Sequence, residues 1–219
     1  RDMLVDEEAN ATITDFIKRK IRARVNDPDV AEKLTPKNHG FGTRRVPLET
    51  NYYEVYNQDN VELVDMLATP VTRVTPTGIE TSEKSYEFDR IIYATGFHAV
   101  MGGFDRVEFR GVGGQTLKEK WADGPRTLLG IQTAGFPNLF TLVGPHNGAT
   151  FCNIPRCIEQ NVEFVSDAIA YMLKHGYERM SAQTQAEDEW TEHVYQAAAK
   201  TLFPTVDSWF MTSNVNLPE

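Results

Sequence analysis

The sequence predicts an α/β fold that combines long amphipathic helices, a small β-meander and two apolar strands. Apolar residues recur at helical spacing over residues 6–25 and again over residues 155–175. Three short strand-like runs separated by turn residues occupy 71–74, 78–81 and 86–88. Residues 91–94 and the run within 136–145 are apolar without alternation, which is typical of strands buried in a parallel sheet.

The composition limits the classes of partner. The 219 residues suffice for one large domain or two small ones, and the net charge of -9 argues against nucleic acid and anionic membranes. No apolar run reaches membrane-spanning length, and we expect a soluble, cytoplasmic protein. Cys152 and Cys157 have no metal-type His or Cys cluster near them, so we expect reduced, buried thiols and no metal site.

The N-terminal stretch predicts two helices. In residues 6–25 the cations crowd the second half, where they suit the helix dipole and could also bind an anion. Asp27 and Pro28 are typical of an N-cap and a first helical position, so a short helix should run to about Leu34. Pro36 and Gly40 end it.

A glycine-bearing turn at 40–47 carries two adjacent arginines, Arg44 and Arg45, and closes on Pro47. Glycine permits tight backbone and close approach of a ligand, and guanidinium groups match phosphates and oxyanions. The pair could therefore flank an anionic cofactor, although an exposed, solvated pair is the commoner state of arginines.

The remainder is predicted to alternate strands and helices. A strand is expected at 61–65, followed by the meander and by the apolar run 91–94, which ends in Thr95 and Gly96. Ligands of open α/β sheets bind at such carboxyl ends of strands. The second apolar run opens into a loop over 144–153, and the long helix 155–175 follows with Gly176 as its stop. A further helix is expected at about 183–202, before an irregular tail.

In combination, the motifs resemble the C-terminal portion of the flavin-dependent Baeyer-Villiger monooxygenases of the phenylacetone and cyclohexanone monooxygenase type. The resemblance covers nearly the whole chain. It rests on Phe-Gly-Thr-Arg-Arg at 41–45, Ala-Thr-Gly-Phe at 94–97, Gly-Phe-Pro-Asn-Leu-Phe at 135–140 and Ser-Trp-Phe at 208–210, and equally on 51–54, 59–61, 117–121 and 158–160, which are specific in this order.

The resemblance implies an enzyme that uses FAD and NADP(H) to insert one oxygen atom of O2 beside a ketone carbonyl through a peroxyflavin, giving an ester or lactone. It implies two dinucleotide-binding domains. Residues 1–60 would end the NADP-binding domain and carry the arginine turn, and residues 61–219 would form the C-terminal part of the FAD-binding domain. Both Gly-x-Gly-x-x-Gly fingerprints would lie upstream of Arg1, so we expect an N-terminal part of the same enzyme beyond this chain.

The resemblance also assigns site residues. Arg45 aligns with the active-site arginine, and Arg44 with a position, commonly lysine, that contacts the NADP 2′-phosphate. Trp209 matches a tryptophan near NADP, and Ile154 a position at the flavin ring, while Thr95, Gly96 and Gly144 would border the cofactors. Ala149, Thr150 and Phe151 would line the ketone pocket.

Two alternatives stay open. An N-hydroxylating or sulfide-oxidising flavin monooxygenase would share the architecture, and the chain could instead be a non-catalytic fragment or scaffold domain. His146 could be taken for a catalytic base, but an isolated loop histidine is more often a polar filler, and we leave it outside the catalytic set.

Overall fold

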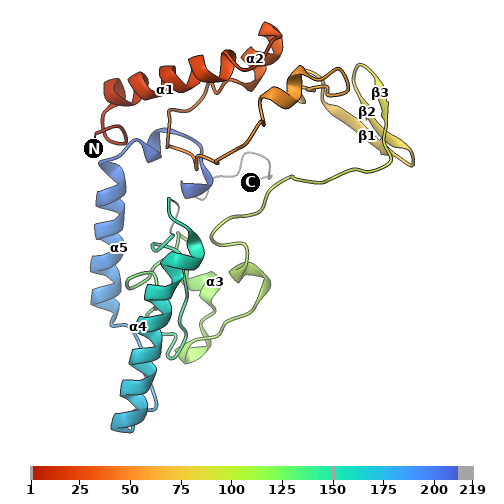
Figure 1. The fold of residues 1–219 in the computed structure, drawn as a ribbon. Coiled ribbons are helices and arrows are strands. Elements are labelled where there is room, and N and C mark those ends of the chain that lie inside the picture. The colour runs from red at the N-terminus through yellow and green to blue at the C-terminus, as the bar shows by residue number, and fades with distance from the viewer. Residues whose placement is uncertain (1, 149–150, 212–219) are drawn as a thin grey trace.

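The computed structural model describes residues 2–148 and 151–211. Two helices, α1 (Glu7–Arg22) and α2 (Pro28–Leu34), precede a three-stranded sheet of β1 (Val71–Thr75), β2 (Gly78–Thr81) and β3 (Ser85–Glu87). The helices α3 (Leu117–Lys120), α4 (Ile154–His175) and α5 (Thr184–Ala199) follow. Short 3-10 turns lie between them: η1 (Glu54–Asn57), η2 (Phe104–Arg106), η3 (Val112–Gly114), η4 (Phe203–Thr205) and η5 (Trp209–Met211). Figure 1 shows an open arrangement, with α1 and α2 along one side, the sheet standing apart and α4 and α5 below.

Local signals fix the helices where the sequence predicts them. Asp6 caps α1 by accepting from the amide of Ala9, and Asp27 caps α2 by accepting from Asp29 and Val30. Gly176 ends α4 in the left-handed region at φ 69°. The predicted helices at 6–25, 155–175 and 183–202 are thus confirmed, with α5 ending a little earlier, at Ala199.

The predicted meander is also confirmed. The strands pair antiparallel in the order β1-β2-β3, with Gly78 opposite both Thr75 and Glu87. A Cβ on Gly78 would meet the carbonyl oxygen of Tyr86 at 1.8 Å, so glycine is needed where the strands approach.

Three predicted strands do not form. Residues 61–65, 91–94 and 136–145 belong to no sheet in the part of the chain that the structure describes. A buried parallel strand needs neighbours on both sides, and here Ile92 is 90% exposed and Phe97 88% exposed. At 138–143 the backbone bonds are scattered instead: Asn138 donates to Met180 and Thr141 donates to Ile131.

The core lies around α3. Leu117, Trp121 and Phe136 are buried together, and Met101, Phe104, Phe109 and Leu139 pack against them. The α5 helix joins this core through the carboxylate of Glu187, which is 0% exposed. Its Oε1 accepts from the amide of Ala134 at 2.8 Å, and its Oε2 lies 2.8 Å from Lys120 Nζ.

The chain leaves much apolar surface uncovered. Its accessible surface is 15663 Å², whereas a compact monomer of this size exposes about 10,000 Å². The apolar stripe predicted along α4 is open, because Val162 and Ile169 are each 43% exposed and Leu173 is 77% exposed. Among the residues searched, no helix combines the length and the apolar character needed to cross a bilayer.

Candidate functional site

The arginine turn is built on the first half of α1. Asn10, only 5% exposed, donates from Nδ2 to the carbonyls of Met3 and Phe41 at 2.6 and 2.9 Å. Its Oδ1 accepts from the hydroxyl of Thr14, and that hydroxyl accepts from the amide of Phe41 at 2.8 Å. One buried and one half-buried polar side chain therefore fix where the turn leaves the helix.

Both glycines of the turn are required by space. A Cβ on Gly40 would lie 2.1 Å from Asn10 Oδ1, and Gly42 has φ +79° with Leu4 at 2.9 Å from such a Cβ. Thr43, 1% exposed, closes the turn by donating from Oγ1 to the Gly40 carbonyl at 2.7 Å. The tight, glycine-dependent turn predicted from the sequence is confirmed.

The two arginines differ in surroundings. Arg44 is partly buried, and its Nε donates to the carbonyl of Asp207 at 3.0 Å. Arg45 is exposed, as are Val46, Pro47 and Leu48 after it. Arg44 thus connects the turn to the C-terminal tail. The two residues are 163 positions apart in the sequence, so this contact could not be predicted from local patterns.

The tail gathers three aromatic rings with the predicted pocket residue Phe151. Phe151 packs on Phe203 at 6.0 Å and on Phe210 at 5.8 Å between ring centroids. Trp209 lies edge-on to Phe210 at 4.6 Å and is 38% exposed. The structure therefore brings Arg44, Trp209 and Phe151 into one region through the tail, whereas Ala149 and Thr150 lie outside the described residues.

Other predicted residues stand apart from these contacts. Thr95 and Gly96 lie on the exposed segment 89–97, and a Cβ on Gly96 would meet no atom within 4 Å. Ile154 is 46% exposed at the first position of α4.

Gly144 is buried for packing reasons. A Cβ there would lie 2.7 Å from Thr141 Oγ1 and 3.1 Å from the Gly130 carbonyl. The loop beside it is braced by Asn161, whose Oδ1 accepts from Val143 N at 2.9 Å and from Asn147 Nδ2 at 3.0 Å. Asn161 and Asn10 were missed by the sequence reasoning. The sequence signal that could have identified them is an asparagine placed among the apolar positions of an amphipathic helix.

His146 is a half-buried packing residue. Its Nδ1 lies 3.0 Å from Thr127 Oγ1, and its ring packs against Tyr195. Burial, and then the charge of Arg126, lower the pKa of His146 below its ordinary value. The interpretation as a polar filler agrees with these contacts.

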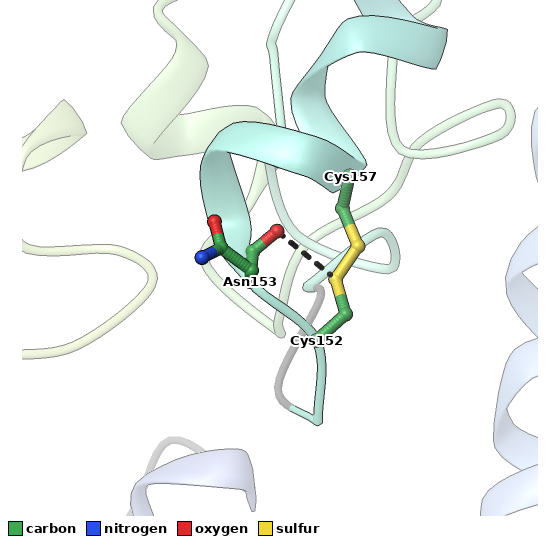
Figure 2. The surroundings of a disulfide bond; sticks show 3 residues. All are labelled: Cys152, Asn153 and Cys157. Atoms are coloured by element: carbon green, nitrogen blue, oxygen red, sulfur yellow. Dashed lines mark hydrogen bonds between the residues drawn. A yellow bond between two sulfur atoms is a disulfide. The ribbon is translucent and has the colours of Figure 1, made fainter.

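The cysteines correct an expectation. Cys152 and Cys157 are joined by a disulfide, on either side of Asn153, the N-cap of α4 (Figure 2). Both are partly exposed, so the expected pair of reduced, buried thiols is wrong. Cys157 lies on the first turn of α4 and faces back to the loop that carries Cys152. The composition alone does not show this local geometry, so it could not predict the disulfide. Among the residues searched, no group of three or more His, Cys, Asp or Glu could hold a metal ion.

Comparison with known proteins decides the relationship. The chain is 51% identical over 211 residues to 2-oxo-Delta(3)-4,5,5-trimethylcyclopentenylacetyl-CoA monooxygenase of Pseudomonas putida, and 42% identical over 215 residues to a Baeyer-Villiger monooxygenase of Pseudooceanicola batsensis. Its homologues are Baeyer-Villiger monooxygenases. The two matches cover 96% and 98% of the chain but 39% of each Baeyer-Villiger relative. No family model matches the chain.

Solved structures agree with the Baeyer-Villiger relationship. A crystal structure of OTEMO in complex with FAD and NADP superposes with a TM-score of 0.90 at 51% identity, covering 95% of this chain and 39% of that one.

A relative with a different named activity is also similar in sequence. A phenazine N-monooxygenase of Lysobacter antibioticus is 38% identical over 216 residues, which cover 98% of this chain and 39% of that protein. The chain therefore spans about two fifths of the length of the proteins it matches.

Proposed function

We propose that the protein carrying this chain is an FAD- and NADPH-dependent monooxygenase that inserts one oxygen atom from O2 beside a ketone carbonyl. The observation that carries the proposal is similarity to Baeyer-Villiger monooxygenases along nearly the whole chain, at 51% identity over 96% of it. The arginine turn, with both arginines, lies inside the matched stretch. The substrates named for the relatives are theirs; for this protein we propose a ketone without choosing one.

The residues present suit the cofactors. Arg44, partly buried and bonded to Asp207, presents a guanidinium beside the tail that carries Trp209. Such a fork matches a phosphate, and the indole offers a flat face to a nucleotide. We assign Arg44, Arg45 and Trp209 to NADP(H), and Ile154, Thr95, Gly96 and Gly144 to the borders of the FAD and NADP sites.

Arg45 is proposed as the catalytic arginine. When bound, the reduced flavin supplies the activated oxygen for the reaction. The guanidinium of Arg45 stays charged at any working pH, so it can stabilise negative charge that develops on the ketone oxygen as its carbonyl is attacked. The same charge can orient the nicotinamide end of NADP. Phe151, Ala149 and Thr150 would form one wall of the ketone pocket.

We further propose that residues 1–60 end an NADP-binding domain and residues 61–219 form part of an FAD-binding domain. The two apolar segments at 91–94 and within 136–145, which belong to no sheet here, would then be strands that pair with residues outside this chain. The large exposed area and the open stripe of α4 support this, because surfaces of that size in a folded protein are normally covered.

The test is product analysis. The complete protein, incubated with FAD, NADPH, O2 and a panel of cyclic and linear ketones, should consume NADPH and release ester or lactone. If a yellow, NADPH-oxidising preparation gives no ester from any ketone, ketone oxygenation is wrong.

N-oxygenation is the second candidate, because the chain is 38% identical to a phenazine N-monooxygenase. Aromatic amines and N-heterocycles in the same assay separate the two, whereas sulfides do not, since both enzyme types oxidise sulfur. A colourless protein that consumes no NADPH would favour the remaining alternative, a scaffold without catalysis.

A further inference from the structure

Residues 44–48, here called the arginine strap, run between two anchors. The first anchor is the turn at Gly40–Thr43, which Asn10 and Thr14 hold against α1. The strap itself has neither helix nor strand structure beyond Arg44, and Arg45 to Leu48 are exposed. Contacts at both of its ends restrict where it can lie.

The second anchor is Arg24, which follows α1 and is 33% exposed. Its Nη1 lies 2.5 Å from Glu49 Oε1 and its Nε lies 2.5 Å from Glu54 Oε1. Its Nη2 donates to Glu54 Oε2 at 2.6 Å, and the guanidinium stacks 5.1 Å from the ring centre of Tyr53. Hydrogen bonds to Arg24 lower the pKa of both carboxyls, as expected for pairs that stay ionised.

Backbone contacts reinforce this anchor. Asn57 Nδ2 donates to the carbonyl of Arg24 at 2.8 Å, and Asn57 Oδ1 accepts from the amide of Asn26 at 2.8 Å. Glu49 Oε2 also accepts from the amide of Tyr52 at 2.7 Å, which starts the turn that leads into η1. Arg24 thus holds Glu49, the residue that follows the strap, and the turn after it.

The two anchors lie at different points along α1. Thr14 is in the middle of the helix, and Arg24 follows its last residue, Arg22. The contacts at the Gly40–Thr43 turn and at Glu49 therefore hold both ends of the segment that carries Arg45.

We infer that Arg24 is a positioning residue for Arg45, acting by holding the C-terminal end of the arginine strap through its bonds to Glu49 and Glu54. The inference rests on the proposed function for its catalytic meaning. Release of that end should misplace Arg45 without removing either cofactor. NADPH, a proton and O2 would then give NADP⁺ and hydrogen peroxide, in place of ester.

The test compares Arg24→Ala with Arg22→Ala in the complete protein. Arg22 is a matched control, because it also pairs with a glutamate, Glu32, at 3.0 Å, but that pair is exposed and does not touch the strap. Arg24→Ala should lower the yield of ester per NADPH on the order of tenfold and raise peroxide, with bound flavin unchanged. Arg22→Ala should keep the parent yield.

Two further variants guard against misfolding. Arg24→Lys can still reach one carboxylate and should restore part of the ester yield, and Glu49→Gln should give an intermediate loss. If Arg24→Ala folds and retains the ester yield of Arg22→Ala, the inference is overturned. The same holds if Arg24→Lys is no better than Arg24→Ala.

A measurement independent of activity separates this inference from the proposed function. Trypsin cuts mobile segments faster than held ones, so with its end at Glu49 released the strap of Arg24→Ala should be cut after Arg44 and Arg45 on the order of ten times faster than that of Arg22→Ala. Equal cleavage rates would reject the anchor. Absence of ester from the parent protein would reject the proposed function and leave the cleavage comparison to decide the anchor.

Discussion

At the scale of single residues, the candidate site depends on a few polar groups whose roles in the structure differ from those that the sequence suggests. Arg44 and Arg45 are adjacent in sequence, yet one bonds to the tail and the other is exposed in this chain. Asn10 touches no proposed substrate, yet its three hydrogen bonds place the turn. By holding the backbone carbonyls of Met3 and Phe41, Asn10 contributes to the placement of the arginines.

Arg45→Ala in the complete protein should retain the fold and bound flavin but lose ester formation. Removal of one preorganised donor to a developing oxyanion costs on the order of a hundredfold or more in rate. Flavin absorbance and ester yield measure the two effects separately. Normal ester formation by Arg45→Ala would falsify the catalytic assignment.

The neighbouring change, Arg44→Ala, should instead weaken the preference of the enzyme for NADPH over NADH.

His146 predicts a pH dependence. Its pKa is lowered in the folded state by burial, so between that value and about 6.5 the unfolded chain binds more protons. The stabilisation is therefore complete above about pH 6.5 and is lost as the pH falls through that window. In His146→Gln, the melting temperature should drop less between pH 7.5 and pH 5.5 than in the parent. An equal drop in the two proteins would show that this histidine does not contribute.

At the scale of elements, helix capping and strand pairing explain which helices and strands form. The buried carboxylate of Glu187 explains how α5 is attached to the core. The caps at Asp6, Asp27 and Gly176 are local, so the sequence predicts these helix ends well. Glu187 could be read only as one of several acidic residues on an exposed helix. Its burial against Ala134 and Lys120 depends on a segment more than fifty residues earlier.

Lys120→Met should destabilise the protein strongly, because it leaves the carboxylate of Glu187 buried without its cation. Breaking such a pair from one side costs about 3–5 kcal/mol. Lys118→Met, on the exposed face of the same helix α3, is the control and should change little. Thermal denaturation of the complete protein measures both, and similar melting temperatures would mean that the ion pair is dispensable.

At the scale of the whole molecule, the chain is an assembly of folded pieces with uncovered apolar surface. Its α3 core and the Glu187 contact unite the lower half, while the sheet stands apart from that half (Figure 1). Exposed Ile92, Phe97 and Leu173 would be buried in a compact protein of this composition. We expect the rest of the protein to cover these surfaces and to complete the cofactor sites.

Residues 1–219 expressed alone should therefore be colourless after incubation with FAD and should bind a hydrophobic dye strongly. The complete protein should be yellow and bind the dye weakly. Flavin absorbance after gel filtration and dye fluorescence give the two readings. Tight retention of FAD by the isolated chain would contradict the proposed division of the cofactor site.

The sequence by itself determined the helices, the meander, the glycine turn and the resemblance that the homologues bear out, because caps, periodicity and short motifs act within a few residues. Tertiary structure alone decided that Arg44 meets Asp207, that Arg24 grips Glu49 and Glu54, and that residues 91–94 stay unpaired. The two arginine contacts depend on segments brought together from far along the chain, and residues 91–94 have no neighbouring strand among the described residues; no local pattern encodes such pairing.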